Sequence, residues 1–184
     1  MSLDSTQSVY RENLLEHLLI GELLKHAWLR RGAELEVSFT AVDRSGHDII
    51  LDANGITRHV QLKSSGTDAR TSSQAIHVHL AQKPSGCVIW TKFSRQLELD
   101  HFLFFGNAPG ERLSNLDGFK TAKHTKGDSQ GIKKERPNLR VVPRSSFKRI
   151  DDISTLYELL FGPSPIQAAP SMPESDDVES NDVD

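Results

Sequence analysis

GHDIILDANGITRHVQLKSS, residues 46–65, contains two short apolar runs, 47–51 and 57–62, joined by Asp52-Ala53-Asn54-Gly55. An Asn-Gly pair between runs rich in β-branched residues is a strong hairpin signal, because a tight primed turn needs positive φ at both central residues. The stretch therefore predicts two adjacent antiparallel strands. In such a hairpin the start of the first strand, at Asp48, meets the end of the second strand, at Gln61 and Lys63.

Three side chains of different chemistry thus gather at one edge of the predicted sheet. Gln61 and Lys63 are two residues apart and point to the same face of a strand. Asp48, with nearby oxygen ligands, could hold Mg²⁺, which prefers octahedral oxygen coordination. A lysine beside the ion can orient or deprotonate a water, or stabilise charge on a phosphate. These groups suit phosphodiester hydrolysis; a hairpin with solvated polar ends is the alternative interpretation.

The spacing of Asp48 and Gln61-Leu62-Lys63 resembles the motif of the PD-(D/E)xK nuclease superfamily, with Gln in place of Glu as in Mrr-type restriction enzymes. His47 stands where the family has proline. The resemblance implies DNA cleavage that depends on Mg²⁺ or Mn²⁺. Asp48 and the main-chain carbonyl of Leu62 would bind the metal. Gln61 would ligate weakly or orient a water, and Lys63 would position the attacking water.

Residues 7–31 predict a helix that ends at Gly32, because the segment lacks proline and carries two arginines in its last turn. Its apolar residues cover almost the whole circumference, which predicts a buried helix. Glu22 lies among these leucines, where a carboxylate needs a partner or a metal.

The first helix of the superfamily commonly carries a Glu that faces the metal, in a setting like Gly21-Glu22 followed by a helix that ends at Gly32. The resemblance therefore implies that Glu22 is a further catalytic metal ligand. Glu16, also flanked by leucines, is the competing candidate. In the alternative interpretation, Glu22 pairs with Arg11 or Lys25 on a solvated strip.

Further strands are predicted at 34–42, 74–80, 87–93 and 101–106, and a closing amphipathic helix at 151–161. The more apolar strand pair predicts an α/β domain with a mixed sheet whose centre is covered on both faces. A helix followed by three antiparallel strands resembles the opening of the restriction-endonuclease fold, and this resemblance implies a restriction endonuclease-like mixed β-sheet core flanked by helices. His77 and His79 would share one face of their strand, as solvated polar groups rather than a metal pair that lacks further ligands. We expect an N-terminal tail at 1–6, a nuclease-like domain at 7–162 and a disordered acidic tail at 163–184.

Residues 119–149 contain ten Lys or Arg against two acids. The middle of this segment, 123–136, has two glycines and little apolar content, and it predicts a mobile loop followed by a short edge strand at 139–143. A basic loop suits contact with a polyanionic backbone. The predicted nucleic-acid-binding residues are Lys120, Lys123, Lys126, Lys133, Lys134 and Arg136.

Composition indicates the compartment in which the protein is expected. No apolar run is long enough to span a bilayer, the first residues lack the pattern of a signal peptide, and the single Cys87 cannot form an internal disulfide. The cytoplasm is the expected compartment. The tail carries six acids and no Lys or Arg, so the net charge of −3 becomes positive without it.

The sequence thus predicts a nuclease that acts on nucleic acid, most simply DNA, without membrane contact; the family also allows a homodimer. The alternative is an inactive nuclease-fold module that binds nucleic acid or a partner protein. A third interpretation has the acidic tail compete for the basic loop.

Overall fold

The computed structural model describes residues 7–40, 46–114, 116–125 and 130–163. The predicted helix is confirmed as α1, Ser8–His26, which continues into one wider π-helical turn, η2, Ala27–Arg31. The chain leaves this turn at Gly32, whose φ of 57° lies in the left-handed region that favours glycine. The predicted tails, 1–6 and most of 163–184, lie outside the described residues.

The predicted hairpin is also confirmed, as strands β2, Ile49–Ala53, and β3, Ile56–Gly66. Asn54 and Gly55 form the turn with φ of 54° and 76°, the two positive values that the primed turn requires. Strand β1, Glu36–Phe39, pairs antiparallel with β2, so three consecutive antiparallel strands follow α1 as predicted.

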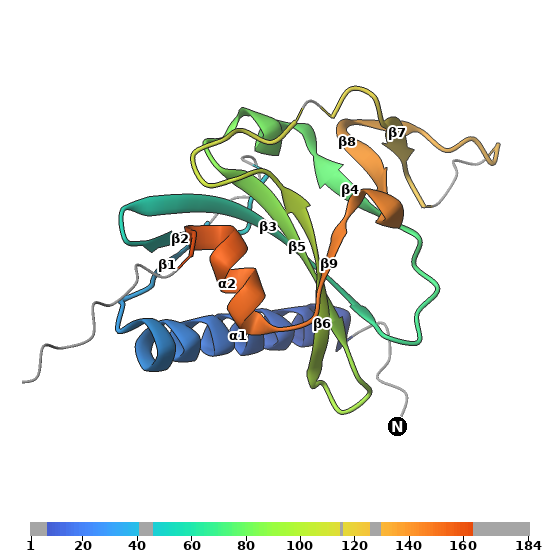
Figure 1. Cartoon of the computed structure of the whole chain (residues 1–184). Coiled ribbons are helices and arrows are strands. Elements are labelled where there is room, and N and C mark those ends of the chain that lie inside the picture. Colours follow the sequence, from blue (N-terminus) through green and yellow to red (C-terminus); the bar gives the residue numbers. More distant parts are fainter. Residues whose placement is uncertain (1–6, 41–45, 115, 126–129, 164–184) are drawn as a thin grey trace, which may run out of the picture.

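These strands form one half of a six-stranded mixed sheet with the order β1-β2-β3-β5-β6-β9 (Figure 1). Strand β3 pairs parallel with β5, whereas β5 pairs antiparallel with β6. Every residue of β5 is buried, as expected for a central strand covered on both faces. The predicted α/β class, a mixed sheet flanked by helices, is confirmed. The other elements of this layer are β5 (Gly86–Phe93), β6 (Leu99–Gly106), β9 (Lys148–Ile150) and α2 (Ile153–Phe161).

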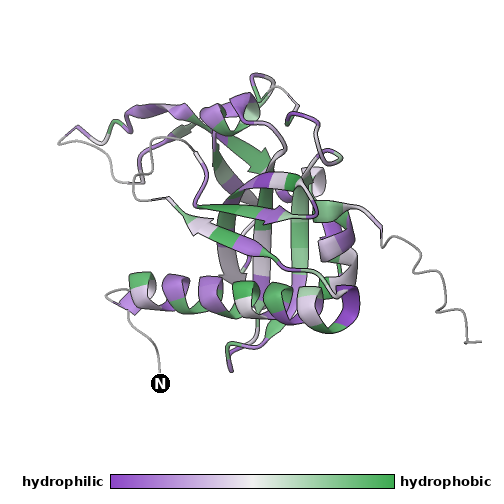
Figure 2. Cartoon of the chain, turned by 90° about the vertical axis from the view of Figure 1, so that its left-hand side faces the viewer, coloured by the Kyte–Doolittle hydropathy of each residue, from purple (hydrophilic) through white to green (hydrophobic). Residues whose placement is uncertain are grey.

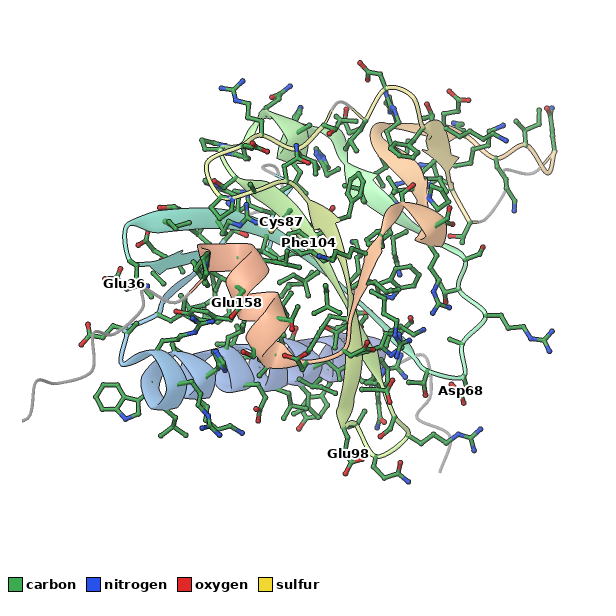
Figure 3. All side chains as sticks on the ribbon, in the orientation of Figure 1. Glu36, Asp68, Cys87, Glu98, Phe104 and Glu158 are labelled. Atoms are coloured by element: carbon green, nitrogen blue, oxygen red, sulfur yellow. The ribbon has the colours of Figure 1, made fainter. Side chains whose placement is uncertain are left out.

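Both helices pack against one face of this sheet and enclose the larger hydrophobic core, which includes Leu19, Leu23, Ile49 and Leu160. Figure 3 places Cys87 and Phe104 inside this core and Asp68 and Glu98 at the periphery. Burial raises the pKa of the Cys87 thiol to about 12, so this cysteine acts as a small core residue.

A second sheet covers the opposite face of the first. The sequence predicts strands at 74–80 and 139–143 but does not predict that they form a separate sheet. Its order is β4-β8-β7, and with the short helical turns it encloses a second core around Trp90 and Leu103. The predicted loop at 123–136 is wrong in part, because its described residues extend the β7–β8 pair: the His124 N–H donates to the Lys134 carbonyl at 2.9 Å. The strands of the second sheet are β4 (Ser73–His77), β7 (Lys120–Lys123) and β8 (Glu135–Pro143), and the short helical turns are η3 (Val78–Gln82) and η4 (Arg144–Ser146).

The prediction that α1 is buried all round is wrong. Only one stripe of α1 packs on the sheet, and Tyr10 and Leu18 of α1 and Trp28 of η2 are exposed. Figure 2 accordingly shows hydrophobic residues interspersed with polar ones along the outward side of α1. Within the part of the chain that the structure describes, no helix is long and apolar enough to cross a membrane.

The closing helix α2 is confirmed, with Asp152 as its N-cap: the carboxylate accepts the Thr155 N–H at 2.8 Å. At its other end, the fully buried Arg58 of β3 donates to the Leu159 carbonyl at 2.8 Å and to the carbonyls of Asn107 and Ala108. This arginine thus ties the last turn of α2 to the sheet.

Candidate active site

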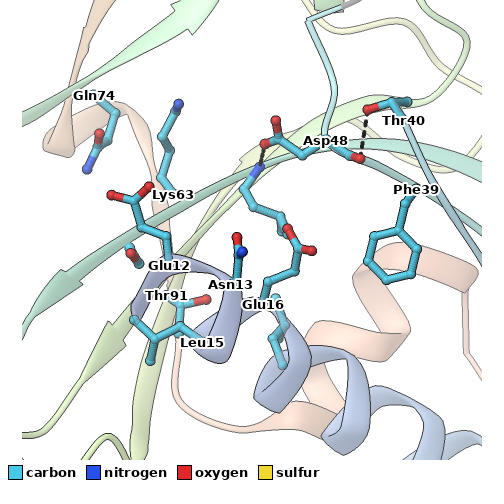
Figure 4. A pocket seen from close by; sticks show the side chains of 13 residues that line it. Glu12, Asn13, Leu15, Glu16, Phe39, Thr40, Asp48, Lys63, Gln74 and Thr91 are labelled. Atoms are coloured by element: carbon cyan, nitrogen blue, oxygen red, sulfur yellow. Dashed lines mark hydrogen bonds between the residues drawn. The ribbon is translucent and has the colours of Figure 1, made fainter. Parts of the chain in front are cut away.

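A pocket of about 520 Å³ lies between the first half of α1 and the region where Asp48 meets β3 (Figure 4). Helix α1 supplies two carboxylates and an amide, the start of the β2–β3 hairpin supplies a third carboxylate, and β3 supplies an ammonium. The lining residues with polar side chains are Glu12, Asn13, Glu16, Thr40, Asp48, Lys63, Ser64, Gln74 and Thr91.

The Asp48 carboxylate is fixed by the backbone of the neighbouring strand. Its Oδ2 atom accepts the N–H of Leu62 at 2.6 Å, and the Asp48 carbonyl accepts the Thr40 hydroxyl at 2.8 Å. In an extended strand, the N–H and C=O of one residue point to the same side. The Leu62 carbonyl therefore points to the side on which Asp48 lies.

Glu16 faces the same pocket from α1. Burial raises the pKa of its carboxyl, and the negative charge of Asp48 raises it further. Two carboxylates that repel one another in a half-buried pocket form an arrangement that a bound cation would stabilise.

Lys63 lines the pocket beside these carboxylates and is half-buried. None of the described residues forms a hydrogen bond or ion pair with its ammonium group. Figure 4 shows the Lys63 side chain between Gln74 and Asp48, with Glu12 below it. The ammonium is therefore available to an anionic ligand.

Glu22 does not lie in this pocket. Its carboxylate pairs with Lys25 at 2.7 Å on the flank of α1 and lines a separate groove beside the β5–β6 turn. At 100° per residue, Glu12 and Glu16 fall on the stripe of Leu19 and Leu23, whereas Glu22 lies roughly a quarter-turn away. The structure thus places Glu16, the competing candidate, in the pocket with Asp48, and it places Glu22 outside that pocket.

Gln61 does not line the pocket either. Its side chain is buried, with 4% of the residue exposed, and Oε1 accepts the main-chain N–H of His77 at 3.2 Å. The amide links β3 to the end of β4, so it contributes to the position of the second sheet. The sequence predicted Gln61 beside Asp48 and Lys63, as a metal ligand or a group that orients water. The structure instead places its side chain outside the pocket.

The histidine pair does not share a strand face, because the strand ends at His77 and the chain turns into η3. The His77 Nδ1 atom accepts the His79 N–H at 3.2 Å, and the two rings pack edge to face. Among the described residues, no three His, Cys, Asp or Glu side chains converge in the arrangement of a metal site.

The predicted nucleic-acid-binding residues that the structure describes lie on the β7–β8 hairpin and are exposed: Lys120, Lys123, Lys133, Lys134 and Arg136. Lys126 lies outside the described residues. The hairpin belongs to the second sheet, whose strand β4 contributes Gln74 to the pocket. The sheet thus joins the basic surface to the wall of the candidate active site.

No protein-family model and no curated protein matches this sequence. Among solved structures, the chain is similar to the bacterial homing endonuclease I-Ssp6803I, with 19% sequence identity and a TM-score of 0.35. The match covers 68% of this chain and 86% of that chain. The similarity is distant, and it assigns no role to the residues of the pocket.

Proposed function

We propose that this protein is a metal-dependent endonuclease that hydrolyses phosphodiester bonds in DNA. The observation that supports this most directly is the convergence of Asp48, Glu16 and Lys63 on one pocket. The order of helix, hairpin and motif residues resembles the PD-(D/E)xK superfamily, and the choice of DNA follows that resemblance.

The pocket fits a hard divalent cation. Two carboxylates, Asp48 and Glu16, and the main-chain carbonyl of Leu62 provide oxygen ligands, which suits Mg²⁺ or Mn²⁺ because such ions retain several waters. The pKa of the Glu16 carboxyl is raised first by burial and then by the negative charge of Asp48, and a bound cation would offset both effects. When bound, the ion would supply Lewis-acid stabilisation of charge on the phosphate and lower the pKa of a coordinated water.

The protein groups have separate roles in this proposal. The ammonium of Lys63, which has no partner among the described residues, contacts a non-bridging oxygen of the scissile phosphate and orients the attacking water. Asp48 is preorganised for metal binding by the Leu62 N–H. Gln61 acts at a distance, because its amide holds the backbone at His77 rather than the pocket.

A second candidate function is nucleic-acid binding without cleavage. The withdrawal of Gln61 from the pocket favours it. Although Glu12 also lines the pocket, no three His, Cys, Asp or Glu side chains among the described residues are arranged so that they could hold one metal ion. Such a module would use the basic β7–β8 hairpin and would bind DNA equally well with or without Mg²⁺.

Cleavage of single-stranded, double-stranded and branched DNA with Mg²⁺ or Mn²⁺ distinguishes the two functions. We expect wild-type protein to cut at least one substrate and Asp48→Ala to cut none, while both bind DNA. If neither protein cuts and both bind DNA alike, the binding module is the better description. Cutting by Asp48→Ala at the wild-type rate would show that the pocket is not the active site.

A further inference from the structure

The hydroxyl of Ser65, near the end of β3, already accepts two hydrogen bonds. The indole N–H of Trp90 donates to its Oγ at 2.8 Å, and the ammonium of Lys92 donates to it at 2.9 Å. A serine hydroxyl has two acceptor lone pairs and one proton to donate. Its acceptor capacity is therefore filled by these neighbours, and only its O–H remains to be used.

The described residues offer no acceptor for that proton within hydrogen-bond distance. Ser65 lines a groove of about 720 Å³ that runs past the end of β3. The O–H is consequently held as a donor for whatever occupies this groove. The acceptor must come from outside the described part of the protein.

A buried cation lies directly behind the hydroxyl. Lys92 is only 1% exposed and donates to the Gly66 carbonyl at 2.6 Å in addition to Ser65. Its ammonium also lies 5.5 Å from the centre of the Trp90 ring, and the acceptors of its hydrogen bonds among the described residues are the Ser65 hydroxyl and the Gly66 carbonyl rather than a carboxylate. Hydrogen bonds polarise one another along a chain, so Lys92 and Trp90 both strengthen the Ser65 O–H as a donor to an anion.

The groove continues from the candidate active site. The two share Glu12 and Ser64 as lining residues, and the groove adds the cations of Arg11 and Arg95. Asp68, an acid in the groove, is paired with Arg95 at 3.1 Å. An extended chain that carries one negative charge per repeat can therefore leave the active-site pocket along this surface.

We propose that Ser65, supported by Lys92 and Trp90, forms a second phosphate-binding subsite, which holds the phosphate adjacent to the one at Lys63. Ser65 is two residues from Lys63 on the same face of β3, roughly 6.6 Å along the strand, which is comparable with the separation of successive phosphates in an extended nucleotide strand. This subsite deepens the proposed function and depends on it for the placing of the first phosphate.

The test is binding of a fluorescently labelled 20-mer DNA, single- or double-stranded, in EDTA, so that metal and cleavage play no part. Ser65→Ala removes the donor, and Ser65→Asp replaces it with an acceptor that can pair with Lys92 and preserve the fold. We expect roughly tenfold weaker binding for Ser65→Ala and a larger loss for Ser65→Asp, because a hydrogen bond to a charged group is lost and then replaced by repulsion. Ser146→Ala, an exposed serine of η4 outside the groove, is the matched control and should bind like wild type.

Thermal unfolding of each variant establishes that the protein is folded. Equal binding by folded wild type, Ser65→Ala and Ser65→Asp would overturn the subsite, even if the protein proves to be a nuclease. Weakened binding in both Ser65 variants, with no cleavage by wild type under any metal, would retain the subsite and reject the nuclease. An equal loss in Ser146→Ala would show that the effect is not local and would also overturn the subsite.

Discussion

The carboxylate of Asp48 and the main-chain N–H of Leu62 are joined by a hydrogen bond of 2.6 Å. This bond connects the residue that precedes β2 to the middle of β3, next to Lys63. The Asp48 carboxylate and the Lys63 ammonium of the candidate active site are therefore held by one hairpin, whereas Glu16 is contributed by a separate element, α1.

Lys63→Ala should abolish most DNA cleavage and leave folding unchanged. The side chain makes no polar contact with the described residues, so its removal costs little stability, whereas loss of a positioned acid–base group lowers kcat by roughly 10²- to 10⁴-fold. Steady-state cleavage and thermal unfolding measure the two effects. Lys148→Ala, an exposed lysine of β9, is the control, and a similar loss of activity there would argue against a specific role for Lys63.

Glu16→Gln and Glu22→Gln distinguish the two helix carboxylates. Glu16 faces Asp48 in the pocket, whereas Glu22 pairs with Lys25 outside it. We expect Glu16→Gln to weaken Mn²⁺ binding by at least about tenfold, since even the partners of metal ligands are worth about 10- to 100-fold in affinity. Isothermal titration calorimetry measures the dissociation constant of Mn²⁺ for wild type and each variant. The reverse ranking would restore Glu22 as the ligand.

Glu16 should also make stability depend on pH. Because its folded-state pKa is raised above 4.5, the native state holds this proton more tightly than the unfolded state. The stability that this provides is present below pH 4.5 and is lost as pH rises through the raised folded-state pKa. Glu16→Gln should therefore have a higher Tm than wild type near pH 7 without metal.

That Tm difference should shrink as the pH is lowered below about 4.5. Added Mg²⁺ should raise the Tm of wild type more than that of Glu16→Gln, because the ion binds the native state of wild type more tightly. Scanning calorimetry across pH 3.5–7.5, with and without Mg²⁺, provides both comparisons. A constant difference at all pH values would show that the pKa of the Glu16 carboxyl is not raised in the native state.

Asp152→Ala should destabilise the protein by about 1 kcal/mol, because Asp152 caps the first turn of α2. The hydrogen bonds from Thr155 lower the pKa of this carboxyl below 3.8, so its contribution is present above pH 3.8 and is lost as pH falls through the lowered folded-state value. Urea unfolding at neutral pH measures the difference. Asp151→Ala, which removes only an exposed pair with Arg149, should cost less than about 0.5 kcal/mol.

Deletion of residues 164–184 should tighten DNA binding at low salt. This segment contains six acids and no Lys or Arg, and its removal makes the net charge positive. The gain should fade as salt increases, because screening weakens interactions between separated charges. Fluorescence anisotropy at several salt concentrations tests this, and unchanged affinity at low salt would exclude competition by the tail.

The hairpin was predictable from the sequence because its signal is local: Asn54-Gly55 fixes the turn, and the turn fixes which residues meet. The end of the first helical segment, at the C-cap of η2, and the start of α2 were predictable for the same reason, since Gly32 and Asp152 each lie directly next to the turn that they cap. The placement of Asp48 next to the Lys63 strand followed directly from the hairpin.

Features that depend on distant segments were not predictable in this way. The sequence of α1 is apolar on several sides, and only the sheet determines that Glu16 rather than Glu22 faces the pocket. Strand β7 is short and basic, and it is a strand because β8 pairs with it. The role of Ser65 depends on Trp90 and Lys92, which become its neighbours through the parallel pairing of β3 with β5.

The contact from Leu62 to Asp48 has an evolutionary consequence. The group that anchors the carboxylate belongs to the backbone, and the Leu62 side chain packs against the hydrophobic core. Position 62 can therefore drift among apolar residues without disturbing the anchor, and proline is the substitution that would remove it. The orientation of the Asp48 carboxylate can therefore be preserved while the side chain that stands beside its anchor changes.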